Sequence, residues 1–379
     1  EVNIMSCFEN VKKNFGFGCM RLPMKGEAVD NAEFCRMADE FIAAGFNYFD
    51  TAHGYLDGKS EVAVRECVVD RYPRDAFVLA DKLTGNYFRD ESEVRPFFES
   101  QLEIMGVDYF DFYLMHAQNR ERYEHFKRCR AYEQAIQLRS EGKIRHLGVS
   151  FHDKAEVLET ILTEYPQLEF VQIQLNYIDY DDPAVQSRRC AEVCRRHGKP
   201  MIIMEPVKGG NLVNLPDDAK AVFDALGNSD YASYALRFAA GEEGVFMVLS
   251  GMSNLEQTRS NIASMKDFKP LDVREREAVS KVCGIFRSEN LIQCTACRYC
   301  IAGCPKKIQI PDLFSCLNAK IIFHAWNADS YYGVHTAHGG KASDCIKCGK
   351  CEKVCPQNLP IRSLLEQVAK TFEKEKENA

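Results

Sequence analysis

The sequence has no long apolar run and no excess of positive charge. No uninterrupted apolar stretch approaches the roughly 18 residues that a membrane-spanning helix needs. The formal net charge is −7 over 379 residues, which argues against nucleic acid or an anionic membrane surface as the main partner. Residues 1–8 lack the charged and apolar regions of a signal peptide. We therefore expect a cytoplasmic protein without a membrane or nucleic-acid partner.

The sequence also lacks a complete dinucleotide fingerprint and any recognisable flavin fingerprint. Gly16 and Gly18 begin a glycine-rich pattern, but the Cys-Met-Arg-Leu-Pro run that follows will not open a helix. A doubly wound sheet should carry such a fingerprint after its first strand. This absence favours a barrel over a doubly wound sheet.

Between residues 15 and 266, short apolar runs alternate with longer amphipathic segments. The short runs have the length of buried strands and are rich in β-branched or aromatic residues. Eight strands alternating with helices over about 250 residues are typical of a (β/α)8 barrel. The expected strands are Phe15–Cys19, Asn47–Asp50, Phe77–Lys82, Tyr109–His116, Ile144–Ser150, Phe170–Asn176, Pro200–Met204 and Val245–Leu249.

Glycines in helix C-cap positions mark the ends of four amphipathic segments. These segments are Asn31–Ala44, Glu91–Met105, Arg128–Glu141 and Glu192–Arg196, followed by Gly45, Gly106, Gly142 and Gly198. We expect a barrel over residues 1–270, a charged linker helix over 271–290 and a second domain over 291–379. Two further helices are expected there, Pro311–Lys320 and Ile361–Phe372.

Cysteine is abundant, with 17 residues, and eight of them form two runs of identical spacing. Each run reads C-x2-C-x2-C-x3-C-P, the spacing of bacterial ferredoxins, in which the fourth thiolate serves the other cluster. A zinc site would leave the third cysteine of each run unexplained, and regular spacing disfavours disulfides. We assign one [4Fe–4S] cluster to Cys294, Cys297, Cys300 and Cys355, and the other to Cys345, Cys348, Cys351 and Cys304.

The insert between the two cysteine runs is rich in aromatic side chains. It contains Phe323, Trp326, Tyr331 and Tyr332. We expect a mostly helical dicluster domain in which these side chains pack around the clusters or against the barrel.

Polar residues close five successive strands of the expected barrel: Asp50, Lys82, His116, Ser150 and Asn176. Active sites of such barrels lie at the strand carboxyl ends. The run Asp50-Thr-Ala-His-Gly-Tyr55, followed by Gly58-Lys-Ser-Glu61, resembles the active-site signature of the aldo-keto reductases. The resemblance covers about residues 15–261. Together with the cysteine runs, it points to the bacterial branch that carries a C-terminal 4Fe–4S ferredoxin-type domain.

This resemblance implies a catalytic tetrad of Asp50, Tyr55, Lys82 and His116. Hydride addition to a carbonyl leaves negative charge on oxygen, which a proton donor must neutralise. An unperturbed tyrosine has a pKa near 10. We expect Lys82, paired with Asp50, to lower the pKa of Tyr55. His116 would polarise the carbonyl from the other side.

The resemblance also implies a nicotinamide cofactor. Ser150 and Gln172 match residues that hold the nicotinamide amide in relatives, but the asparagine expected after Ser150 is absent. Gln257 stands where an arginine for a 2′-phosphate is common, so NADP(H) is expected and NAD(H) stays open. The implied cofactor residues are Met20, Arg21, Asp50, Ser150, Gln172, Glu205, Pro206, Val207, Lys208, Gly251, Ser253, Gln257 and Asn261.

We expect His53, Tyr55, His116, His152 and the loop 117–123 to line a substrate pocket. Their polarity favours a hydroxylated or sugar-like carbonyl compound, or the corresponding alcohol. Nicotinamide moves two electrons as hydride, whereas each cubane moves one. Three functions therefore remain open: a nicotinamide-dependent carbonyl reductase whose clusters relay electrons or brace the fold, a ferredoxin- or flavin-linked reductase without nicotinamide, and a redox-sensing subunit. A ferredoxin or flavoprotein would be the redox partner.

Overall fold

The computed structural model describes residues 8–228, 230–288, 292–337 and 339–373. The expectation based on the absence of a signal peptide rests mostly on residues 1–7, which lie outside these ranges. Within the described ranges, no helix is both long and apolar enough to cross a bilayer.

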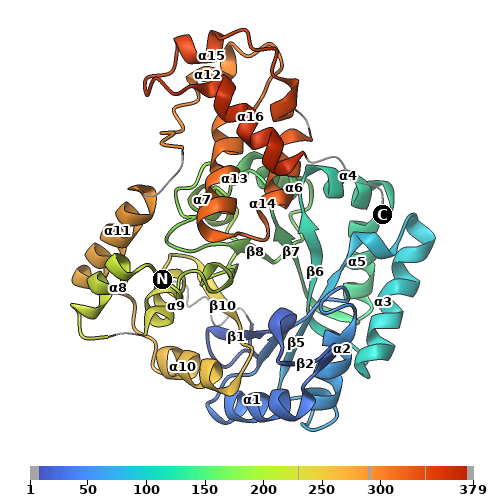
Figure 1. The fold of residues 1–379 in the computed structure, drawn as a ribbon. Coiled ribbons are helices and arrows are strands. Elements are labelled where there is room, and N and C mark those ends of the chain that lie inside the picture. The colour runs from blue at the N-terminus through green and yellow to red at the C-terminus, as the bar shows by residue number, and fades with distance from the viewer. Residues whose placement is uncertain (1–7, 229, 289–291, 338, 374–379) are drawn as a thin grey trace.

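Eight parallel strands close into a barrel in the order β1-β10-β9-β8-β7-β6-β5-β4 (Figure 1). All eight predicted strands are confirmed, with shifts of one or two residues at their ends. A short antiparallel hairpin, β2 (Met24–Lys25) and β3 (Ala28–Val29), follows the first strand. The barrel strands are β1 (Phe15–Gly18), β4 (Tyr48–Asp50), β5 (Val78–Leu83), β6 (Phe110–Gln118), β7 (Ile144–Phe151), β8 (Phe170–Gln174), β9 (Met201–Met204) and β10 (Val245–Gly251).

Helices surround the barrel on its outside (Figure 1). Asp90 caps the third helix by accepting from Ser92 N, and Gly106 ends it with φ 68°, a conformation that a side chain would strain. The helix predicted over 128–141 is wrong at its start, because Arg130 takes φ 49° and separates two helices. The helices are α1 (Asn31–Ala43), α2 (Lys59–Val64), α3 (Glu91–Met105), α4 (Arg120–Arg128), α5 (Ala131–Ser140), α6 (Ala155–Glu164), α7 (Ser187–Arg196), α8 (Asp217–Asp224), α9 (Tyr231–Ala240) and α10 (Leu255–Lys266).

Apolar side chains fill the half of the barrel interior nearer the amino ends of the strands, and polar residues lie at the carboxyl ends. Phe8 packs there against Phe112 and Phe246, with ring centroids 5.1 and 4.6 Å apart. Gly148 leaves room for this packing, since a Cβ at that position would lie 2.5 Å from the Phe170 ring. The filled interior therefore confines any ligand to the strand carboxyl ends.

The C-terminal region is helical, as predicted. It consists of α11 (Val273–Ser288), α12 (Tyr299–Ala302), α13 (Ile310–Phe323), α14 (Ala328–Thr336), α15 (Lys350–Lys353) and α16 (Ile361–Phe372). In Figure 1, α13 and α14 lie next to the barrel near β7 and β8, while α12 and α15 lie at the far tip. The region beyond residue 291 therefore covers one side of the barrel mouth.

Candidate functional site

Asp50 and Lys82 form a buried ion pair at the carboxyl end of the barrel. Asp50 is the last residue of β4, and Lys82 lies near the end of the neighbouring β5. The Lys82 Nζ atom lies 2.6 Å from Asp50 Oδ1 and 2.6 Å from Thr51 O. Lys82 is only 1% exposed, so its charge is held inside the protein. Burial alone would lower the pKa of Lys82, but Asp50 and Tyr55 outweigh it, and the pKa is raised.

Tyr55 and His116 lie beside this ion pair. Lys82 Nζ lies 4.9 Å from the centre of the Tyr55 ring, and the rings of Tyr55 and His116 are 6.0 Å apart at 76°. The turn after Tyr55 uses φ 53° at Leu56 and φ 55° at Asp57. The structure thus brings together all four residues that the sequence proposes as a tetrad.

The pKa of Tyr55 is raised, and the prediction that it is lowered is wrong. Tyr55 keeps some accessible surface because it lines a cavity, but protein surrounds it, and burial is the largest effect on its pKa. The Lys82 charge and hydrogen bond oppose that effect without overcoming it, and Asp50 adds to it. Tyr55 therefore keeps its proton at neutral pH and is ready to donate it.

His116 is held in its neutral form. Burial, followed by the Lys82 charge, lowers the pKa of His116 well below its usual range. Its Nδ1 atom lies 2.6 Å from Thr84 Oγ1. A neutral imidazole fixed at Nδ1 can donate a hydrogen bond through Nε2 when that nitrogen carries the proton.

His53 is not among the described residues that line the cavity with the tetrad, and its role as a substrate residue stays a prediction. Its Nδ1 atom lies 2.8 Å from Glu61 Oε2, and its ring contacts Tyr87 and Phe97 edge-on. Glu61 in turn accepts from Gln101 Nε2 at 3.0 Å. His53 therefore belongs to a polar network beside the cavity.

One cavity of about 300 Å³ connects the tetrad with the barrel mouth. Four of its lining residues come from the C-terminal region: Trp326, Asn327, Ser330 and Tyr331. Sequence reasoning singled out Trp326 and Tyr331 as packing aromatics, but no local pattern shows that they reach the site. The barrel contributes Gly18, Met20, Arg21, Asp50, Tyr55, His116, Ala117, Arg122, His152, Gln172, Met204, Glu205, Leu249 and Gly251.

The structure divides the proposed cofactor residues into two groups. Met20, Arg21, Gln172, Glu205 and Gly251 line the cavity together with Asp50. The buried Gln172 Oε1 atom has no hydrogen-bond partner among the described residues, so it can accept from a bound amide. Such an unpartnered acceptor beside Tyr55 fits the amide of a nicotinamide ring.

The other proposed cofactor residues contact the protein itself. Pro206 and Val207 lie in the loop after β9 and, among the described residues, do not line the cavity. Their partners within the protein are as follows: Ser150 Oγ accepts from Ala117 N, Lys208 Nζ lies 2.5 Å from Asp179, Ser253 Oγ donates to Arg21 O, Gln257 Oε1 accepts from Ser253 N, and Asn261 Nδ2 donates to Ser250 Oγ.

Glu205 occupies the position where the resemblance leads one to expect a stacking aromatic. It has φ 57°, and burial raises the pKa of its carboxyl against the opposing charges of Arg21 and Lys208. Trp326 hydrogen-bonds to this carboxyl. The C-terminal region thus contacts the loop after β9 directly.

The eight cysteines of the two runs line two separate cavities. Cys294, Cys297, Cys300 and Cys355 line one, and Cys304, Cys345, Cys348 and Cys351 line the other. This crossed grouping is the one that the sequence proposes. Among the described residues, no three His, Cys, Asp or Glu side chains lie close enough to hold a single metal ion. Four thiols around one cavity fit a cubane, whose iron atoms lie at separate corners.

The backbone of the two runs repeats as well. Ala296 and Lys347, two residues after the first cysteine of each run, have φ 53° and 57°. Arg298 and Gly349, two residues further on, have φ 65° and 71°. Such left-handed residues turn successive N–H groups toward one point, where an anionic cluster is stabilised. The residues present therefore fit two cubanes.

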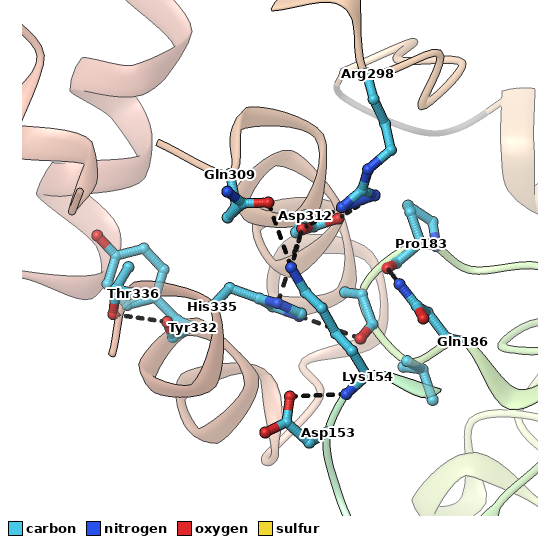
Figure 2. Close-up of polar contacts among 12 residues, drawn as sticks. Asp153, Lys154, Pro183, Gln186, Arg298, Gln309, Asp312, Tyr332, His335 and Thr336 are labelled. Carbon is cyan, nitrogen blue, oxygen red and sulfur yellow. Dashed lines mark hydrogen bonds and ion pairs between the residues drawn. The ribbon is translucent and has the colours of Figure 1, made fainter. Parts of the chain in front are cut away.

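A buried carboxylate joins the first cysteine run to the barrel (Figure 2). Asp312, 0% exposed, accepts two hydrogen bonds from Arg298, at 3.0 and 2.9 Å. Lys154, in the loop after β7, lies 3.0 Å from the same carboxylate. His335 Nε2 donates to Ala184 O at 3.1 Å. These contacts hold the cluster loop against the barrel.

Comparisons with known proteins cover both parts of the chain. The profile described as "Aldo/keto reductase family" matches residues 14–282, and the profile "4Fe-4S dicluster domain" matches residues 293–360. An uncharacterized oxidoreductase YqkF of Bacillus subtilis is 25% identical over 285 residues, covering 65% of this chain and 85% of the relative. An NADH-specific methylglyoxal reductase of Escherichia coli is 25% identical over 267 residues, covering 58% and 79%.

Solved structures share the barrel. The aldo-keto reductase AKR11C1 from Bacillus halodurans, in its holo form, superimposes with a TM-score of 0.58 at 24% identity, covering 72% of this chain and 92% of that chain. An aldo-keto reductase from Klebsiella pneumoniae in complex with NADPH gives a TM-score of 0.58 at 22% identity, covering 72% and 95%.

Proposed function

The chain belongs to the aldo/keto reductase family and carries a 4Fe-4S dicluster domain, and from this premise we propose that it reduces the carbonyl group of a small aldehyde or ketone with hydride from NAD(P)H. The observation that carries the proposal is the single cavity that holds Tyr55, His116 and Gln172 above the Lys82–Asp50 ion pair.

Tyr55 is the proposed proton donor. NAD(P)H, when bound, supplies hydride to the carbonyl carbon, and the oxygen then needs a proton. Tyr55 is protonated at neutral pH and lies beside the buried ammonium of Lys82, which stabilises the phenolate that forms. Asp50 keeps Lys82 charged and in place. Lys82 therefore makes the transfer of the Tyr55 proton to the carbonyl oxygen more favourable.

His116 is the proposed second donor to the carbonyl oxygen. Its lowered pKa keeps the ring neutral, so it polarises the carbonyl without adding a competing strong acid. The hydrogen bond with Thr84 fixes the ring orientation. Tyr55 and His116 thus approach the same oxygen from two sides.

Six cavity residues are proposed to hold the nicotinamide half of the cofactor: Met20, Arg21, Asp50, Gln172, Glu205 and Gly251. Gln172 offers a free amide oxygen. The relative named as an NADH-specific methylglyoxal reductase and the structure solved with NADPH support a nicotinamide cofactor of either kind.

The eight cysteines of the two cavities are proposed to hold two [4Fe–4S] clusters, which supply single-electron chemistry or structural support. The ion pairs of Asp312 with Arg298 and Lys154 support a bracing role, because they connect the first cluster loop to the loop that carries His152.

The test uses the full chain, purified without oxygen, and follows NADH and NADPH absorbance with a panel of aldehydes and ketones. We expect carbonyl-dependent oxidation of at least one of the two cofactors. If neither responds while reduced ferredoxin bleaches the clusters, the proposal is wrong and a ferredoxin-linked reductase takes its place.

A further inference from the structure

We propose that the substrate is a carbonyl compound that also carries an anionic group, a carboxylate or a phosphate, and that Arg122 binds this group. The inference rests on the proposed function and names the substrate class for the same site. It differs from the hydroxylated or sugar-like carbonyl compound that the sequence favours by requiring an anionic group.

Arg122 is a cation that lines the cavity together with His116 and His152. In the described part of the chain Arg122 forms no ion pair, and the neighbouring Glu121 acts on its charge only at longer range. Its neighbour Arg120, by contrast, lies 3.5 Å from Glu156.

The other charged groups of the cavity compensate one another. Lys82 is paired with Asp50. Arg21 faces Glu205, whose carboxyl also feels Lys208. Arg122, on which only Glu121 acts from outside the cavity lining, therefore supplies a positive charge on the side where the substrate carbonyl would approach His116.

The backbone holds Arg122 in place. Its Nη1 atom donates to Ala117 O at 2.9 Å. Ala117 has φ 50° and lies where the pairing of β6 with β7 shifts register. Ser150 Oγ accepts from Ala117 N at 2.6 Å and stabilises this turn. The bulge thus fixes one edge of the guanidinium and leaves its other donors for a ligand.

The surroundings make this charge costly without a counterion. Arg122 is partly buried, and burial lowers the pKa of its guanidinium against the opposing charge of Glu121. Burial lowers the pKa of His116 and lowers that of His152 to about 4, and the Arg122 charge adds to both effects. A bound anion would compensate the partly buried charge of Arg122, and the planar guanidinium matches carboxylate and phosphate oxygens in pairs.

The C-terminal region encloses this side of the cavity. Asn327, Ser330 and Tyr331 line it, and the rings of Tyr331 and His152 lie 6.4 Å apart. Enclosure removes water that would otherwise screen the charge of Arg122, so an ion pair formed there is stronger than one at the surface.

The reaction balances without a further reactant. For succinic semialdehyde, the aldehyde carbon accepts hydride from NAD(P)H, and its oxygen accepts a proton from Tyr55. The products are 4-hydroxybutyrate and NAD(P)+, and solvent returns the proton to Tyr55. The carboxylate bound to Arg122 is unchanged.

The test compares matched substrate pairs with the full, cluster-loaded chain: succinic semialdehyde against butanal, and glyceraldehyde 3-phosphate against glyceraldehyde. We expect a higher kcat/KM for the charged member of at least one pair, and the better pair distinguishes carboxylate from phosphate. Arg122→Gln should lower this charged-to-neutral ratio by roughly 10- to 100-fold, mainly through KM. Arg122→Lys should retain part of the ratio, and the control Arg120→Gln should retain all of it.

Two outcomes would overturn the inference. A wild-type enzyme that reduces neutral carbonyls at least as well as charged ones would refute it and leave the proposed function intact. Equal losses on both members of a pair in Arg122→Gln would show a structural role only. If no carbonyl is reduced, the proposed function fails, and calorimetric binding of 4-hydroxybutyrate and of glycerol 3-phosphate still decides the inference. Weaker binding of at least one of them to Arg122→Gln supports the inference. Unchanged binding of both would overturn it.

Discussion

Burial sets the protonation states of Tyr55 and His116 more strongly than their charged neighbours do. Lys82 acts on both side chains, yet desolvation is the larger effect in each case. Because desolvation disfavours the charged form, it raises the pKa of the phenol and lowers that of the imidazole. Both groups are neutral hydrogen donors at physiological pH, which suits reduction better than oxidation.

The pH profile of carbonyl reduction follows from the raised pKa of Tyr55. Reduction needs the protonated phenol, so kcat/KM should stay level between about pH 6 and pH 9 and fall only above about pH 10. Oxidation of the alcohol needs the phenolate and should therefore rise with pH over the same range. Steady-state rates in both directions test this, with circular dichroism as the control for folding. A fall in reduction with an apparent pKa near 7 would contradict it.

At the scale of single elements, the N-terminal end of α10 differs from a typical phosphate-binding site because side chains of the protein already bind its N–H groups. Leu255 N donates to Glu33 at 3.0 Å, and Ser253 N donates to Gln257 Oε1 at 2.8 Å. Arg259 is held by Glu40 at 2.8 and 2.6 Å. The N–H groups of Ser253 and Leu255 are therefore already bound by side chains of the protein, and Arg259 is paired with Glu40.

We predict a preference for NADH over NADPH, in contrast to the expectation of NADP(H) from sequence. The carboxylate of Glu33 should repel a 2′-phosphate, so kcat/KM for NADH should exceed that for NADPH by at least about tenfold. Glu33→Gln should reduce this ratio. Glu99→Gln, on the exposed face of α3, is the matched control and should leave it unchanged. A wild-type preference for NADPH would contradict the prediction.

Sequence predicts the barrel well because its signals are local. Each strand is a short apolar run, and Gly106 ends α3 because glycine readily adopts the positive φ of 68° found there. The sequence also predicts that the four tetrad residues lie close together, since parallel strands bring their carboxyl ends to one face. The break at Arg130 has no such signal, because the chain places an arginine in a conformation that usually selects glycine.

At the scale of the whole molecule, the cluster domain and the barrel share one site. Asn327 Nδ2 and Tyr331 OH both donate to Gln174 Oε1, at 3.0 and 3.2 Å. Such contacts join residues more than 150 positions apart in the chain. The composition of the insert predicts aromatic packing, but only the folded chain shows which surface Trp326 and Tyr331 reach.

The crossed grouping of cysteines gives a prediction for iron content. Two cubanes contain eight iron atoms, so Cys297→Ala should lose about half of them. Adding Cys355→Ala should cost no more iron, because both thiols line the same cavity. Adding Cys304→Ala instead should remove most of the remainder, because that thiol lines the other cavity.

Iron analysis and the electronic spectrum of anaerobic preparations measure these losses. Cys35→Ala, which removes a partly buried thiol of α1 outside both cavities, is the control. Additional loss from Cys355→Ala, with none from Cys304→Ala, would contradict the crossed grouping.

The most direct test of the proton-donor role is carbonyl reduction by Tyr55→Phe. This change removes one hydroxyl and keeps the ring beside Lys82. We predict that kcat falls by roughly 10²- to 10⁴-fold, while NADH and NADPH bind as tightly as to the unaltered protein, measured by fluorescence titration without oxygen. Retention of most of the activity would contradict the account.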